Sequence, residues 1–167
     1  MNCKFLSSLL FLIATTLLIG CYSFKGTSIP PGVNTFNVLH VNSAVPEAPP
    51  TLGQDFGDML IDKIRSESRL KYDESDPDLE FDCKITEYSV TSIDPQPDET
   101  TAYNELRIAI DVEYIDNQNE ENNWKQNFSF FERFESSQNL VTVQDQLHDV
   151  ILTEITTKVF DKAFTNW

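Results

Sequence analysis

The clearest chemical pattern in this 167-residue sequence is the stretch Leu18-Ile19-Gly20-Cys21. Lys4 and the apolar run Phe5–Ile19 come before it, and they give the charged and apolar regions of a secretory signal. Gly20 supplies the small residue that a signal peptidase needs beside its cleavage site. A cysteine at that point offers a thiol that can be loaded with lipid before the chain is cut. The spacing therefore predicts a lipid anchor on Cys21 and a mature chain that begins there.

This pattern resembles the signal of bacterial lipoproteins, which have an aliphatic residue three positions before the cysteine. The alternative is an uncleaved anchor, because Phe5–Phe24 approaches the roughly 20 apolar residues of a membrane-spanning helix. The uninterrupted apolar core has the length of a signal peptide, and Tyr22-Ser23-Phe24 is a poor flank for a stop-transfer segment. We expect a signal peptide over 1–20, a lipidated tether over 21–32 and one folded domain over 33–167.

The charge balance disfavours nucleic acid as a partner. The 12 Lys and Arg residues stand against 27 Asp and Glu residues, which gives a formal net charge of −15. An acidic domain as a whole repels phosphate backbones and anionic head groups. A solvated acidic surface is the simplest interpretation, and affinity for divalent cations or a basic partner is the alternative.

No other residue pattern predicts catalysis, a metal site or a cofactor. Cys83 is the one cysteine beyond the signal and the anchor, and its place on an alternating strand pattern predicts a buried, inert thiol. His40, expected within a strand, and His148 lack a neighbouring nucleophile or second metal ligand. The acidic stretch Tyr72–Asp78 faintly resembles a calcium loop but lacks its glycine and closing glutamate. We therefore do not expect an enzyme.

Hydrophobic periodicity predicts the elements that must carry this domain. Thr35–Val41 is rich in β-branched and aromatic residues and predicts a first strand. Thr51 and Gln54 form a capping box that opens an amphipathic helix reaching to about Ser68. Three more strands are expected at Leu79–Val90, Glu105–Ile115 and Trp124–Phe134.

The strand patterns also predict local detail. The inward alternation of Leu79–Val90 slips by one position, which predicts a β-bulge near Thr86-Glu87. Glu105–Ile115 separates apolar side chains from charged ones such as Arg107, as expected for a sheet that is covered on one face and wet on the other. Trp124–Phe134 likewise places Phe131 on the face opposite its other aromatic residues.

A final helix of about six turns is expected, with Thr142 as its N-cap. Two adjacent apolar rows give it one wide face: Val143, Leu147, Ile151, Ile155, Val159 and Ala163, and beside them Leu152, Phe160 and Phe164. Such a helix must lie across a sheet or against another helix. The element order β-α-β-β-β-α predicts an α/β (α+β) two-layer sandwich, in which two helices pack on one face of a four-stranded mixed sheet.

Several stretches of the mature chain resemble the lipopolysaccharide-assembly lipoprotein family LptE, and the likeness is closest to its Bacteroidetes-type members. They are Cys21–Gly26, Ser28–Pro31, Thr35-Phe36, Pro50–Leu52, Phe131–Phe134 with Ser136-Ser137, and Phe160–Ala163 with Asn166-Trp167. The combination, more than any one stretch, is specific to the family.

The resemblance implies a non-enzymatic lipoprotein on the periplasmic side of the outer membrane. Such proteins plug an LptD-type β-barrel and help deliver lipopolysaccharide to the cell surface. Lipopolysaccharide binding in enterobacterial relatives depends on basic residues, which are few here, and none is carried over from a family site. The alternative is a stand-alone periplasmic lipoprotein that binds a ligand or divalent cation at Tyr72–Asp78 and Asp116–Asn123.

Overall fold

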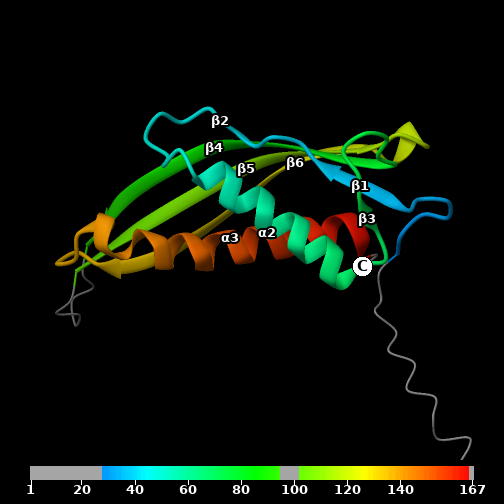
Figure 1. Cartoon of the computed structure of the whole chain (residues 1–167). Coiled ribbons are helices and arrows are strands. Elements are labelled where there is room, and N and C mark those ends of the chain that lie inside the picture. The colour runs from blue at the N-terminus through cyan, green and yellow to red at the C-terminus, as the bar shows by residue number, and fades with distance from the viewer. Residues whose placement is uncertain (1–27, 95–101, 166–167) are drawn as a thin grey trace, which may run out of the picture.

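The computed structural model describes residues 28–94 and 102–165, which form two layers (Figure 1). One layer is a β-sheet, and the other consists of helices α2 (Leu52–Glu67) and α3 (Leu140–Phe164). The two helices contact each other and lie on the same face of the sheet (Figure 1). The predicted α+β sandwich, with both helices on one face of a mixed sheet, is confirmed.

The sheet has six strands, so the prediction of four is wrong. The strands are β1 (Thr35–Val38), β2 (Asn42–Ser43), β3 (Lys71–Tyr72), β4 (Leu79–Ile93), β5 (Tyr103–Asp116) and β6 (Trp124–Glu135). The spatial order is β3-β1-β4-β5-β6, and β2 pairs with β4. The additional strands β2 and β3 have two residues each, which is too short to show a period.

The N-terminal strands pair in parallel and the later ones in antiparallel fashion. β1 is parallel to both β3 and β4, and β2 is parallel to β4. A parallel pair needs a long crossover, which α2 provides between β1 and β4. Strands β4, β5 and β6 form the expected meander, in which a short 3-10 helix, η1 (Glu120–Asn122), lies between β5 and β6.

The first strand ends earlier than predicted. β1 stops at Val38, although Leu39 N still donates to Phe81 O at 2.9 Å, and strand pairing with β4 resumes only at Asn42. His40 is exposed and lies between β1 and β2, so its expected place within a strand is wrong. Val38 is paired with Phe81 and Asn42 with Lys84, so this segment has one more residue than the stretch of β4 opposite it, which composition alone does not reveal.

The predicted bulge is confirmed. The register between β4 and β5 shifts between Ile85 and Glu87, and the Thr86 hydroxyl donates to Ala109 O at 3.3 Å. The shift brings the alternation back into phase, because Tyr88 packs against the core cluster after the bulge. The extra residue of the bulge therefore explains why the apolar pattern in the sequence slips by one position.

Of the two predicted N-caps, Thr51 is at the N-cap position of α2 as expected, whereas Thr142 is wrong. Thr51 has helical dihedral angles (φ −82°, ψ −19°), so within the described residues its side chain makes no cap hydrogen bond. α3 begins before Thr142, because Asn139 Oδ1 accepts from Val141 N at 3.0 Å and caps the helix there.

The core fills the space between the helix layer and the sheet. Both apolar rows of α3 contribute to it, and Ile151, Ile155, Val159 and Phe164 are fully buried. Phe81 of β4 contacts Tyr114 and Phe164 edge to face, with ring centroids 5.4 Å and 6.1 Å apart. Burial of each large apolar side chain contributes roughly 1.5–3 kcal/mol, so this layer boundary dominates the stability of the fold.

Candidate functional site

The predicted lipidation site, Cys21, and the signal before it lie outside the described residues. The structure does show where the tether joins the domain. Ser28 N donates to Phe164 O at 2.6 Å, at the C-terminal end of α3. The following residues turn sharply, because Val33 N donates to Pro30 O and Gly32 has a φ of 95° that favours glycine. The chain is thus fixed to the domain from Ser28 onward.

The face of the sheet opposite the helices, here called the uncovered face, carries the charged side chains of β4, β5 and β6. At one end, here called the polar end, Lys125 Nζ lies 3.2 Å from Glu113 Oε2, and Asn127 Nδ2 donates to Asp111 Oδ1 at 2.8 Å. The hydrogen bond to Glu113 raises the pKa of Lys125. A groove of about 420 Å³ at this end includes Asp82 and Lys84 among its lining residues. Acidic residues and lysines alternate here, and their opposite charges offset each other.

Toward the other end of this face, two arginines flank an exposed aromatic ring. We call Glu105, Arg107, Phe131 and Arg133 the arginine–phenylalanine cluster. The Arg107 guanidinium carbon lies 4.9 Å from the Phe131 ring centroid, and that of Arg133 lies 5.9 Å from it. Glu105 bridges both arginines, at 2.8 Å to Arg107 Nη2 and 3.7 Å to Arg133 Nε. The sequence predicted the faces of Arg107 and Phe131 correctly but missed the cluster, which only the strand register reveals.

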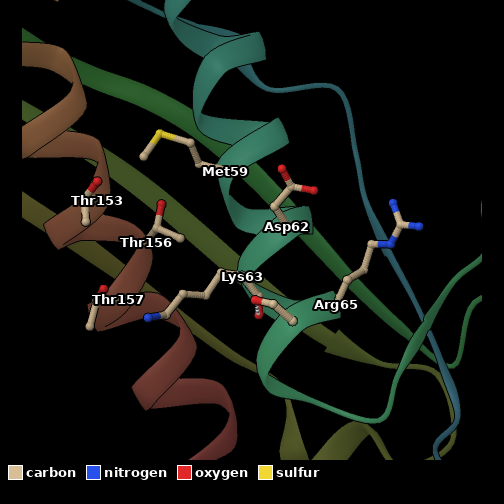
Figure 2. Close-up of a pocket in the computed structure, with 8 residues that line it drawn as sticks. Met59, Asp62, Lys63, Arg65, Thr153, Thr156 and Thr157 are labelled. Carbon is tan, nitrogen blue, oxygen red and sulfur yellow. Dashed lines mark hydrogen bonds between the residues drawn. The ribbon is translucent and has the colours of Figure 1, made fainter.

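A groove of about 580 Å³ runs between α2 and α3 on the helix layer. Figure 2 shows Thr153, Thr156 and Thr157 of α3 on one side, with Met59 and Lys63 of α2 on the other. Lys63 Nζ is paired with Glu67 at 3.0 Å. The Thr156 hydroxyl is buried and has no hydrogen-bond partner among the described residues. Met59 packs against the core, as the sequence predicted.

Burial favours the neutral forms of Cys83, Tyr88 and His148. Burial, with a contribution from Asp82, raises the pKa of the Cys83 thiol to about 12, which agrees with the predicted buried thiol. Tyr88 Oη lies 3.1 Å from His148 Nε2. Burial lowers the pKa of His148 and raises that of Tyr88, so each side chain pairs with the other without carrying charge.

In the acidic loops Tyr72–Asp78 and Asp116–Asn123, carboxylates accept hydrogen bonds that fix the path of the backbone. Asp116 is almost fully buried and accepts hydrogen bonds from Gln118 N, Asn119 N and Asn122 Nδ2. Asp78 accepts from Asn34 N at 2.7 Å, and this bond is the main reason that its pKa is lowered. In the part of the chain that the structure describes, no three His, Cys, Asp or Glu residues are grouped as a metal site. The hydrogen bonds that Asp78 and Asp116 accept fix the turns of these two loops.

Within residues 28–94 and 102–165, no helix is both long enough and apolar enough to cross a bilayer.

Known structures share this fold at low sequence identity. A minor lipoprotein from Acinetobacter baumannii is 8% identical, with a TM-score of 0.51 over 78% of this chain and 91% of that one. A PelC dodecamer from Paraburkholderia phytofirmans is 12% identical, with a TM-score of 0.52 over 85% and 94%. A putative lipoprotein from Caulobacter crescentus is 14% identical, with a TM-score of 0.50 over 75% and 87%. At such identities the likeness shows the fold alone.

Sequence comparison is more specific. No curated protein matches the chain. The family model described as LptE, lipopolysaccharide-assembly, matches residues 36–165, which include every helix and nearly every strand residue of the described domain. This chain belongs to the LptE family of lipopolysaccharide-assembly lipoproteins.

Proposed function

We propose that the chain is anchored in the outer membrane by lipid on Cys21, faces the periplasm, and plugs an LptD-type β-barrel that delivers lipopolysaccharide to the cell surface. The family match over residues 36–165 is the observation that carries this proposal. The role is one of binding and filling, in which no covalent bond is made or broken.

The architecture suits a plug. A single core between two layers gives a compact body (Figure 1). The charged side chains of the uncovered face, among them Arg107, Glu113 and Lys125, suit a water-filled lumen. A plug must also keep its place, and the packing of α3 against β5 and β6 holds the two layers together. Such a body keeps its shape while a substrate passes beside it.

The anchor would fix the height of the plug above the membrane. Ser28 is bonded to the end of α3, so only the stretch from Cys21 to Ser28 separates the lipid from the folded body. That stretch spans at most about 25 Å when fully extended. Each buried lipid CH₂ contributes about 0.8 kcal/mol, so two or three acyl chains hold the domain firmly at this distance.

The proposal is tested by purifying the acylated chain from outer membranes solubilised in mild detergent and identifying its partners by mass spectrometry. We expect an outer-membrane β-barrel of the LptD type. Recovery of soluble partners alone contradicts the proposal.

The anchor has its own test. Cys21→Ser removes the acyl acceptor, and we expect an unprocessed precursor that no longer fractionates as a mature outer-membrane lipoprotein. Processing is read from the mass of the chain. Normal processing and normal fractionation of this variant contradict the anchor on Cys21.

A further inference from the structure

We propose that the arginine–phenylalanine cluster is the point at which the domain docks on the wall of its barrel partner. A carboxylate side chain of that wall pairs with Arg107 and Arg133, and Phe131 provides the apolar contact between them. This inference rests on the proposed function and adds to it the face of the domain that meets the barrel.

The cluster is held in place before any partner arrives. The register between β5 and β6 sets Arg107 opposite Phe131 and Glu105 opposite Arg133. Glu105, whose side chain is only 14% exposed, contacts one guanidinium through each carboxylate oxygen. Both guanidiniums also lie within cation–π range of the same ring. Binding therefore needs little further ordering of these side chains.

The cluster is also accessible. The side chains of Arg107 and Arg133 are 37% and 56% exposed, and Phe131 is 38% exposed. Among the described residues, Phe131 is the only aromatic one in the set of exposed large apolar side chains. A guanidinium has five N–H donors, so bonding to Glu105 leaves each arginine with donors to offer an incoming carboxylate.

The composition of the cluster favours a protein as its occupant. Aromatic residues and arginine are enriched in protein interfaces, whereas lysine is depleted there, and the cluster contains no lysine. Its two guanidiniums and one carboxylate leave a single positive charge, which complements one carboxylate. A highly anionic glycolipid meets repulsion from a chain whose formal net charge is −15. A protein wall can present one carboxylate at a fixed position.

Its position on the sheet also suits docking. β6 is the last strand in the sheet order, so the cluster lies toward the rim of the uncovered face. α3 packs on the opposite side of β6 and supports the strand from behind. A partner wall can therefore approach the cluster without displacing either helix.

The polar end of the same face supplies a matched control. Lys125 lies on β6, as Phe131 and Arg133 do, and its side chain is 64% exposed. It pairs with a carboxylate across the strands, and no aromatic ring of the described residues flanks it as Phe131 flanks the arginines. Lys125→Gln thus removes a cation from the same strand and face without touching the cluster.

The test compares three variants of the full-length acylated chain: the double variant Arg107→Gln with Arg133→Gln, Phe131→Ala, and the control Lys125→Gln. The barrel recovered with each chain from solubilised outer membranes is measured by quantitative mass spectrometry. We expect at least tenfold lower recovery with the double variant and a clear loss with Phe131→Ala. Lys125→Gln should recover as much barrel as the unmodified chain. Thermal unfolding of each purified chain reports whether it is folded.

A second measurement does not depend on the arginine variants. A photoreactive benzoylphenylalanine replaces Phe131 in one chain and Lys125 in another. Irradiation of intact membranes should crosslink position 131 to the barrel far more strongly than position 125.

The outcomes separate the two proposals. If the unmodified chain recovers a barrel and both cluster variants recover it equally well, the docking site is refuted and the proposed function stands. If the unmodified chain recovers no barrel, both are refuted. A crosslink from position 131 to lipopolysaccharide, or to a different protein, refutes the barrel wall as occupant.

Discussion

The two faces of the sheet come from the same strands but contribute differently to the molecule. Phe130 and Phe131 are neighbours in the chain, yet Phe130 packs against the core and Phe131 lies among arginines on the uncovered face. Cross-strand neighbours on the covered face are mainly apolar, as in the pairs Phe81–Tyr114 and Ile110–Phe128, whereas those on the uncovered face are mainly ion pairs and hydrogen bonds. The alternation of one strand thus provides the core and the exposed surface together.

The energies of the two faces differ accordingly. A fully buried aromatic side chain contributes several kcal/mol, whereas an exposed ion pair contributes about 0–1 kcal/mol. The covered face therefore sets the stability of the fold. The uncovered face is left able to vary in composition and to meet a partner.

The sharpest test of this difference in energy replaces one phenylalanine on each face by alanine. Phe81→Ala removes a fully buried ring and should lower the free energy of unfolding by about 3–5 kcal/mol. Phe131→Ala removes a partly exposed ring and should lower it by at most about 1 kcal/mol. Both are measured by denaturant unfolding of the full chain in detergent. Similar losses at the two positions contradict the contrast.

In the helix layer, Gly53 and Gly57 form a second pair of positions to compare, at the place where α2 approaches Val41. A Cβ at position 53 would lie 2.5 Å from the carbonyl oxygen of Val41, whereas one at position 57 would lie 3.5 Å from its Cγ2. Gly53→Ala should therefore destabilise the fold by about 1–3 kcal/mol. Gly57→Ala makes an ordinary contact and should stabilise the helix by up to about 1 kcal/mol. Melting temperatures that shift in the same direction contradict this close approach.

The polar contacts at the end of the sheet should have a smaller, pH-dependent effect. Asp78 accepts hydrogen bonds from Asn34 N, Thr35 N and Gln118 Nε2, which lower its pKa. Its contribution is fully present above the ordinary pKa of 3.8 and is lost as the pH falls through the lower folded value. Asp78→Asn should cost about 1 kcal/mol at neutral pH. The difference from the unmodified chain should shrink as the pH falls below 3.8, and a constant difference contradicts this assignment.

The smallest effect is expected in the groove between the helices. The Thr156 hydroxyl is buried without a hydrogen-bond partner in the described ranges, so its desolvation is uncompensated. Thr156→Val replaces this hydroxyl by a methyl group of similar size. The variant should unfold at slightly higher denaturant concentration, with a gain of up to about 1 kcal/mol. A loss of stability shows that the hydroxyl has a partner in solution.

The main elements were predictable from the sequence because the hydrophobic periodicity within each of them extends over many residues. The apolar rows of α3 and the apolar alternation of β5 indicate which side of each element faces the core. The one-position slip of the alternation before Tyr88 indicates the bulge in β4. Features decided by a distant partner were not predictable. β2 and β3 exist because Lys84-Ile85 and Thr35-Phe36 offer them edges, and their own two residues carry no signal.

The same distinction applies to the candidate site. The sequence placed Phe131 and Arg107 on the charged face, because each strand's alternation is local. It did not place them beside each other, because their contact depends on the register between β5 and β6. The Asn139 cap was missed for a similar reason, since Thr142 offered an equally good capping side chain nearby.

The proposed role of this LptE-family chain is that of the plug of an outer-membrane barrel. The most direct measurement is the composition and native mass of the complex formed by the acylated chain after mild extraction from outer membranes. We expect a stable complex that contains one LptD-type β-barrel for each copy of the chain. An acylated chain that is extracted alone, or with soluble proteins only, contradicts this role.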